Sequence, residues 1–127
     1  MQYMMLIYLD ENSITEEQRS QCYLESAGYA RQLHAEGKCL AVAPLQPTLT
    51  ATSIRHQDGK QVITDGPFAE TREQLGGFFL INAANLDEAL EIARKIPAAR
   101  WGTVEVRPVM EISGLPSKKG ERTLSIS

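Results

Sequence analysis

The stretch Tyr3-Met4-Met5-Leu6-Ile7-Tyr8-Leu9 decides the fold, because its side chains are apolar or aromatic at every position rather than at alternate ones. Successive side chains of a strand point to opposite faces, so this pattern predicts a strand that is covered on both faces. The segment Gly76-Gly77-Phe78-Phe79-Leu80-Ile81-Asn82-Ala83 repeats the pattern and predicts a second strand of the same kind. Both strands are expected in the middle of a sheet.

Two segments have the apolar spacing and the end signals of helices. In the first, Ser13-Ile14-Thr15-Glu16 fits a capping box, and Gly37 suits the left-handed residue that often ends a helix. In the second, Asn85 can cap a helix with Glu88 three residues on, and Pro97 terminates the apolar stripe. We therefore expect one long helix and one short helix.

The remaining strands are shorter. Cys39–Ala43 is an apolar run, and Thr103–Arg107 alternates between apolar and polar side chains, which predicts a strand with one buried face. Thr52–His56 and Gln61–Thr64 flank Asp58-Gly59, which is a strong signal for a two-residue hairpin turn. We expect this hairpin to face solvent.

The order strand, helix, strand, inserted hairpin, strand, helix, strand is the split βαβ pattern of an α+β, ferredoxin-like fold. Two helices would cover one face of its antiparallel sheet. The central strands are apolar on the other face too, and a monomer rarely exposes so large an apolar patch. A second copy packed sheet to sheet is the economical cover, so we predict a homodimer. We assign residues 1–112 to this domain and residues 113–127 to a polar tail.

Composition limits the function classes. The chain of 127 residues suits one domain, and its net charge of -3, without a basic cluster beyond Lys118-Lys119, argues against nucleic-acid binding. No window approaches the length of a membrane span and the N-terminus lacks the basic region of a signal peptide, which predicts a cytoplasmic protein. Cys22 and Cys39 lack metal-ligand spacing and are expected to be buried, reduced thiols. We expect no metal and no cofactor.

The stretch Thr64–Thr71, TDGPFAET, places candidate functional side chains at a strand end. Asp65 is the leading catalytic candidate if Phe68 buries it and raises its pKa; alternatively it holds the turn by accepting backbone donors. Phe68 is either a pocket wall or a plug beneath the loop. Glu70 and the following Arg72 either bind a polar group of a ligand or form a solvated rim.

Three other features give weaker signals. His34 near the end of the long helix is either a proton carrier or a packed ring that interacts with the helix dipole. His56 in the hairpin is expected at the surface. The pair Gly76-Gly77 lacks the spacing of a phosphate-binding loop and precedes a strand, so it predicts a bulge or a close approach of two backbones.

Four stretches in order resemble the DGPF group of the YCII-related family: YMMLIY (3–8), LQPTLTATSIR (45–55), VITDGPFAETREQLGGFFLI (62–81) and IPAARWGTVEVRPV (96–109). The resemblance implies a ferredoxin-like subunit that pairs into a dimeric α/β barrel. It does not settle an activity; for the better-studied branch of the family, acid-base chemistry by a histidine and an aspartate in a cleft is proposed. Other members of the group resemble accessory proteins encoded beside extracytoplasmic-function sigma factors.

The chain departs from that better-studied branch at the histidine. The histidine of that branch lies two turns before a His-x-Glu-Gly motif, which is His34–Gly37 here, and Ser26 occupies its position. Serine unaided has no pKa near 7 and cannot replace imidazole as a general base.

Two hypotheses follow, and the sequence does not decide between an enzyme and a non-enzyme. The first is a homodimer that binds or acts on a small organic molecule in the cleft between sheet and helices. Asp65 would be its polar anchor, and the further ligand contacts would be Phe68, Glu70, Arg72, Ser26 and His34. The second is an accessory protein whose hairpin and tail contact a partner such as a sigma factor.

Overall fold

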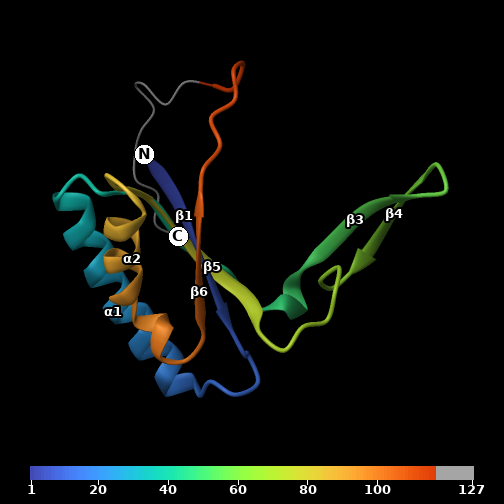
Figure 1. The fold of residues 1–127 in the computed structure, drawn as a ribbon. Helices are drawn as coiled ribbons and strands as arrows, with labels where there is room; N and C mark the ends of the chain where they lie inside the picture. The colour runs from blue at the N-terminus through green and yellow to red at the C-terminus, as the bar shows by residue number, and fades with distance from the viewer. Residues whose placement is uncertain (117–127) are drawn as a thin grey trace.

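The computed structural model describes residues 1–116, in which two helices cover one face of a four-stranded sheet (Figure 1). The strands, in spatial order, are β2 (Cys39–Pro44), β5 (Gln74–Asn82), β1 (Gln2–Leu9) and β6 (Thr103–Pro108), and all neighbours are antiparallel. The helices are α1 (Glu16–Ala35) and α2 (Leu86–Arg94), with short 3₁₀ turns at Thr48–Thr50 (η1) and Pro97–Arg100 (η2). The predicted α+β, ferredoxin-like fold is confirmed, with β1 and β5 at the centre.

The core lies between the helices and one face of the sheet. Alternate residues of the central strands form its floor, and the largest fully buried side chains are Met5, Phe79, Ile81 and Ile96. Small and branched residues on the inner faces of both helices close it from above. Burial of these side chains is the main source of stability for a domain of this size.

The opposite face of the sheet is apolar as well. Register places Leu6 beside Phe78 and Met4 beside Leu80, and all four side chains are only half-buried. We call these four residues the open sheet face. Both helices lie on the other side (Figure 1), so the covering predicted for this face does not come from the helices of the same chain.

The N-terminus of α1 differs from its prediction. Thr15, not Ser13, is the N-cap: its hydroxyl accepts from the Gln18 amide at 3.1 Å, and the Gln18 side chain accepts from the Thr15 amide at 2.9 Å. Ser13 is unavailable because its hydroxyl donates to the Asp10 carboxylate at 2.8 Å in the preceding turn. Other end signals are confirmed, since Gly37 has φ +75° and Asn85 caps α2.

The inserted segment forms a separate two-stranded hairpin of β3 (Thr52–Gln57) and β4 (Lys60–Asp65), which extends away from the main sheet (Figure 1). Asp58 and Gly59 between them have φ values of 51° and 75°, as a two-residue hairpin turn of this kind requires. The predicted turn and the solvent-facing hairpin are confirmed.

The glycine pair on β5 also behaves as predicted. The register with β1 shifts between Ile7 and Tyr8, which leaves Gly76 as the extra residue of a bulge. At Gly77 an added Cβ would lie 2.9 Å from the Ala43 carbonyl oxygen on β2, a close approach that only glycine permits.

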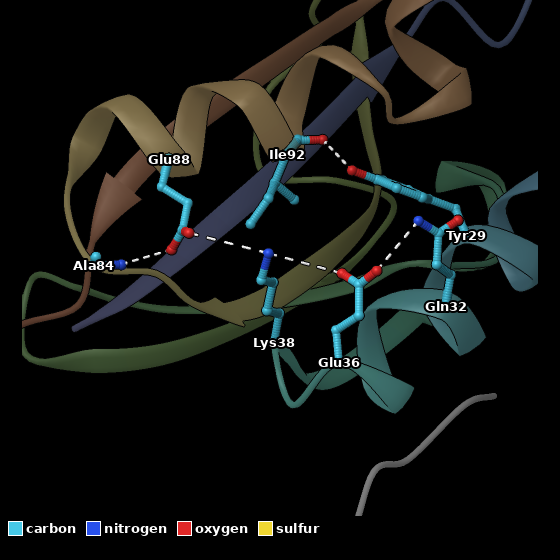
Figure 2. Close-up of polar contacts among 7 residues, drawn as sticks. All are labelled: Tyr29, Gln32, Glu36, Lys38, Ala84, Glu88 and Ile92. Carbon is cyan, nitrogen blue, oxygen red and sulfur yellow. Dashed lines mark hydrogen bonds and ion pairs between the residues drawn. The ribbon is translucent and has the colours of Figure 1, made fainter.

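Polar contacts join the two helices (Figure 2). The Tyr29 hydroxyl on α1 donates to the Ile92 carbonyl on α2 at 2.8 Å. Lys38 lies between two carboxylates, with its Nζ 3.7 Å from Glu36 and 4.0 Å from Glu88. Burial, followed by the charge of Glu36, raises the pKa of Tyr29 to about 12. Tyr29 therefore stays a neutral donor throughout the physiological pH range.

Candidate functional site

A pocket of about 260 Å³ lies between α1 and the sheet, where a cleft was predicted. Ile7 and Leu9 of β1 and Phe79 of β5 contribute to its sheet side, and Ala27 and Ala30 line it from α1. Almost all of these lining side chains are apolar. A cavity of this kind, with few polar groups, is the usual form of a small-molecule site.

Small residues leave the space that the pocket occupies. Ala27 and Ala30 on α1 and Gly76 and Gly77 on β5 all line the pocket, and larger side chains at the two alanine positions would reduce its volume. Gly77 cannot take a larger residue without displacing β2. The pocket therefore follows from the sequence of both elements together.

Cys22 and Ser26 are neighbouring polar residues of α1 that line the pocket, which Tyr23 also lines. Ser26 lies one turn after Cys22, and the Oγ and Sγ atoms are 4.0 Å apart. Burial raises the pKa of the Cys22 thiol, and the contact with Ser26 and the charge of Arg100 oppose this effect without cancelling it. The thiol is thus protonated at neutral pH, and neither group is a ready base or nucleophile.

A second hollow of about 40 Å³ adjoins the pocket and shares Leu9, Cys22, Tyr23 and Gly76 with it. Its remaining lining is more polar. We call it the polar hollow; it adds Glu11, Ile14, Arg19, Leu45, Pro47 and Gln74.

Hydrogen bonds hold two of the polar side chains of this hollow. The Glu11 carboxylate accepts from the Thr48 amide at 2.9 Å and from its hydroxyl at 2.7 Å. The Gln74 side-chain oxygen accepts from the Glu11 amide at 2.9 Å. These contacts fix the η1 connection against the end of β1.

The structure places Ser26 and His34 apart. Ser26 lines the pocket, whereas His34 is exposed, near the C-terminal end of α1, and outside the lining. Eight residues of helix separate them by about 12 Å along the axis. His34 is therefore placed as a surface residue near a helix C-terminus, and a ligand-binding role for it stays a prediction.

The loop after β4 does not reach the pocket of its own chain. Asp65 and Glu70 are exposed, and Phe68 is 80% exposed, so Phe68 neither plugs the core nor buries Asp65. Within residues 1–116, the Asp65 carboxylate accepts no hydrogen bond that would hold the turn. Instead, the Gly66 amide donates to the Ala51 carbonyl at 2.7 Å. Whether these residues contact a ligand stays a prediction.

Thr71 and Arg72 of that loop contact a residue that lines the polar hollow. The Gln74 side chain, which lines the hollow, donates to the carbonyls of Thr71 and Arg72. The pKa of Asp10 is lowered mainly by the Ser13 hydroxyl, and the Arg72 charge adds to the effect. Arg72 therefore lies near the Asp10 turn and Gln74, at the end of the sheet where the polar hollow is found.

Three general findings limit the chemistry of the site. Cys22 and Cys39 are buried and free, as predicted. Among residues 1–116, no cluster of three or more His, Cys, Asp or Glu side chains is arranged to hold a metal ion. No helix in the same part of the chain has both the length and the apolar character needed to cross a membrane.

Sequence reasoning missed Cys22 and Arg19 as site residues. A helical signal was available, because Arg19, Cys22, Ser26 and Ala30 follow the i, i+3, i+7, i+11 spacing of one helix face. The prediction favoured the loop instead, because several residue types that are common in functional sites lie close together in the TDGPFAET stretch. The floor of the pocket has no such local signature, since it depends on which strands the fold brings together.

Comparison with known proteins agrees with this fold. The YCII-related domain family matches residues 1–113. An uncharacterized protein of Rhizobium meliloti (strain 1021) is 41% identical over 114 residues, covering 86% of this chain and 92% of the relative. The structure of TftG, the 5-chloro-2-hydroxyhydroquinone dehydrochlorinase of Burkholderia phenoliruptrix AC1100, in complex with 2,5-dihydroxybenzoquinone, is similar in fold. Its TM-score is 0.56 at 15% identity, over 87% of this chain and 94% of that one. Because the family match covers most of its length, the chain belongs to the YCII-related family.

Proposed function

We propose that this chain is a homodimeric member of the DGPF group that binds a small organic molecule in the pocket between α1 and the sheet. The observation that carries the proposal is the pocket itself: about 260 Å³, mostly apolar, with the Ser26 hydroxyl among its few polar groups. The similar fold of TftG, solved with a small quinone bound, supports a ligand of this size.

Binding is better supported than catalysis by the residues of a single chain. Ser26 supplies no group with a pKa near 7, and the Cys22 thiol is kept neutral by burial. A catalytic or anchoring Asp65 would require the 66–73 loop to rearrange, or the hairpin of a second copy to approach the pocket. Phe68, Glu70 and Arg72 would then follow Asp65 as ligand contacts.

The homodimer is proposed from the open sheet face. Met4, Leu6, Phe78 and Leu80 form a contiguous apolar strip along the two central strands. Two copies that pack through this strip would remove it from water on both sides, and a two-fold axis makes the patch complementary to itself.

Native mass spectrometry of protein purified gently from its own cells tests the ligand proposal. The expected result is a bound small molecule in the wild-type protein that is lost in Ala27→Leu, which fills the pocket. Ala35→Leu makes the same substitution at an exposed position of the same helix and retains the ligand. If none of the three folded proteins carries a bound small molecule, the proposal is refuted.

The accessory hypothesis remains a separate prediction. The exposed hairpin, which carries Ile54 opposite Ile63, is available as a contact surface for a partner such as a sigma factor. The tail was the other predicted contact surface, and residues 117–127 lie outside the described residues. A cytoplasmic location is likewise still a prediction.

A further inference from the structure

The geometry points to a carboxylate as the anionic end of the ligand, bound by Arg19 in the polar hollow, with the apolar body of the ligand in the larger pocket. This inference rests on the proposed function, because it names the chemical class of the molecule that the pocket takes. It requires three conditions: the two hollows must be continuous, Arg19 must be unoccupied, and the sizes must match.

The first condition is supported by the position of the two hollows, which adjoin along one face of α1. They share four lining residues, and Arg19, Cys22 and Ser26 follow each other at helical spacing from the polar end toward the apolar end. A single molecule can therefore contact Ser26 and Arg19 together. The residues that line both hollows are Leu9, Cys22, Tyr23 and Gly76.

Arg19 is the charged group that remains for a ligand. Glu11 already accepts two hydrogen bonds from Thr48, and Gln74 is bonded at both ends of its amide. Among the described residues, the Arg19 guanidinium has no ion-pair or hydrogen-bond partner, although it lines a hollow that is partly closed from solvent. A guanidinium that is partly shielded from water and has no partner in the described part of the chain is available to an anionic ligand.

The chemistry of guanidinium selects a carboxylate. Its planar fork donates two parallel hydrogen bonds to a carboxylate, which makes the pair directional as well as charged. The polar hollow, at about 40 Å³, is of the size that such a group needs, since it would otherwise hold about three waters. The larger hollow offers almost no hydrogen-bonding groups, so it favours an uncharged, apolar body.

Octanoate and 1-octanol are matched probes for this inference, because they differ only in the anionic group. Each is titrated into the ¹⁵N-labelled full chain, and the amide shifts of Ser26 and Gly76 report binding in the pocket. In the wild-type protein we expect octanoate to bind roughly fivefold to tenfold more tightly than 1-octanol. Added salt weakens octanoate binding and leaves 1-octanol binding unchanged, because salt screens only the charged contact.

Arg19→Gln removes the charge and keeps most of the side-chain length, and Arg31→Gln is the matched control on an exposed turn of the same helix. In Arg19→Gln the preference for octanoate is expected to disappear, with 1-octanol binding retained. In Arg31→Gln the preference persists. Circular dichroism confirms that both variants fold.

The outcomes separate this inference from the proposed function. If 1-octanol binds in the pocket but octanoate binds no better, or if Arg19→Gln keeps the preference, the carboxylate inference is wrong and the pocket remains a ligand site. If neither probe shifts the pocket amides, the inference is also wrong. In that case, native mass spectrometry tests the proposed function independently, by showing whether a small molecule is bound.

Discussion

The Tyr29 hydroxyl on α1 and the Ile92 carbonyl on α2 are joined by a hydrogen bond of 2.8 Å, which links the two helices beside the core (Figure 2). The Tyr29 ring also packs near Phe79 on the sheet, with ring centroids 6.3 Å apart. One side chain therefore connects both helices to the central strand. Its protonation state should affect the stability of the whole domain.

Tyr29→Phe tests this connection through pH. At pH 7 the variant should lose about 1 kcal/mol of unfolding free energy, because the hydrogen bond to Ile92 is lost while the ring remains. The folded-state pKa of Tyr29, about 12, lies above the usual tyrosine pKa of about 10. The stabilising contribution of Tyr29 is therefore complete below pH 10 and is lost as the pH rises through about 12.

Urea unfolding at several pH values measures this effect. The difference in unfolding free energy between wild type and Tyr29→Phe should be constant up to pH 9 and shrink at higher pH. The variant controls for the lysines, which ionise in the same range in both proteins. A difference that grows with pH would contradict the assigned direction of the pKa shift.

The cap of α1 gives a second prediction. Thr15→Ala should lower the unfolding free energy by about 1 kcal/mol, since the hydroxyl accepts from the Gln18 amide. Ser13→Ala is the matched control and should cost less than about 0.5 kcal/mol, because its hydroxyl serves only an exposed turn with Asp10. Thermal unfolding compares the stability lost in the two variants. A larger loss in Ser13→Ala than in Thr15→Ala would show that Ser13 is the N-cap.

Glycines at two positions provide a third prediction. An added Cβ at Gly102 would lie 2.0 Å from the Tyr8 carbonyl oxygen, so Gly102→Ala should destabilise the fold by about 3 kcal/mol or more. At Gly28 on α1 the nearest atom is 3.8 Å away, and Gly28→Ala should instead stabilise by roughly 0.5–1 kcal/mol. A urea midpoint that does not fall in Gly102→Ala would show that Gly102 is not sterically required.

Much of the fold was predictable because it depends on periodicity. The apolar patterns of β1 and β5 placed them at the centre of the sheet, and Asp58-Gly59 located the hairpin turn to the residue. The cap of α1 was not predictable in this way. Ser13 and Thr15 have the same capping chemistry, and the choice between them was made by a hydrogen bond from Ser13 to Asp10.

The candidate site was less predictable, for a physical reason. Ser26 and the cleft were anticipated, but the lining combines α1 with three strands, and a cavity is a property of their packing. Asp65 and Phe68 were favoured because chemistry-bearing residues cluster in that stretch, yet local sequence does not say whether a loop faces the core or solvent. In the single chain both face solvent.

The open sheet face gives the last prediction, which concerns assembly. In sedimentation equilibrium the wild-type protein should have twice the mass of its 14.1 kDa chain. Leu80→Lys puts a charge at the middle of the strip formed with Met4, Leu6 and Phe78. Each dimer would then bury two unpaired charges, which together cost at least about 3 kcal/mol, so the dimer should dissociate at least about a hundredfold more readily.

Leu24→Lys is the matched control, because Leu24 is 74% exposed on α1, away from the open sheet face. It should leave the mass at that of the wild type, and circular dichroism should show that both variants keep their helices. Leu80→Lys and Leu24→Lys each add one positive charge to the same folded chain. A difference in mass between the two variants therefore reports the position of the charge. If the wild-type protein stays monomeric and folded at high concentration, the dimer proposal is wrong. The Asp65 loop of a second copy could then not contribute to the pocket.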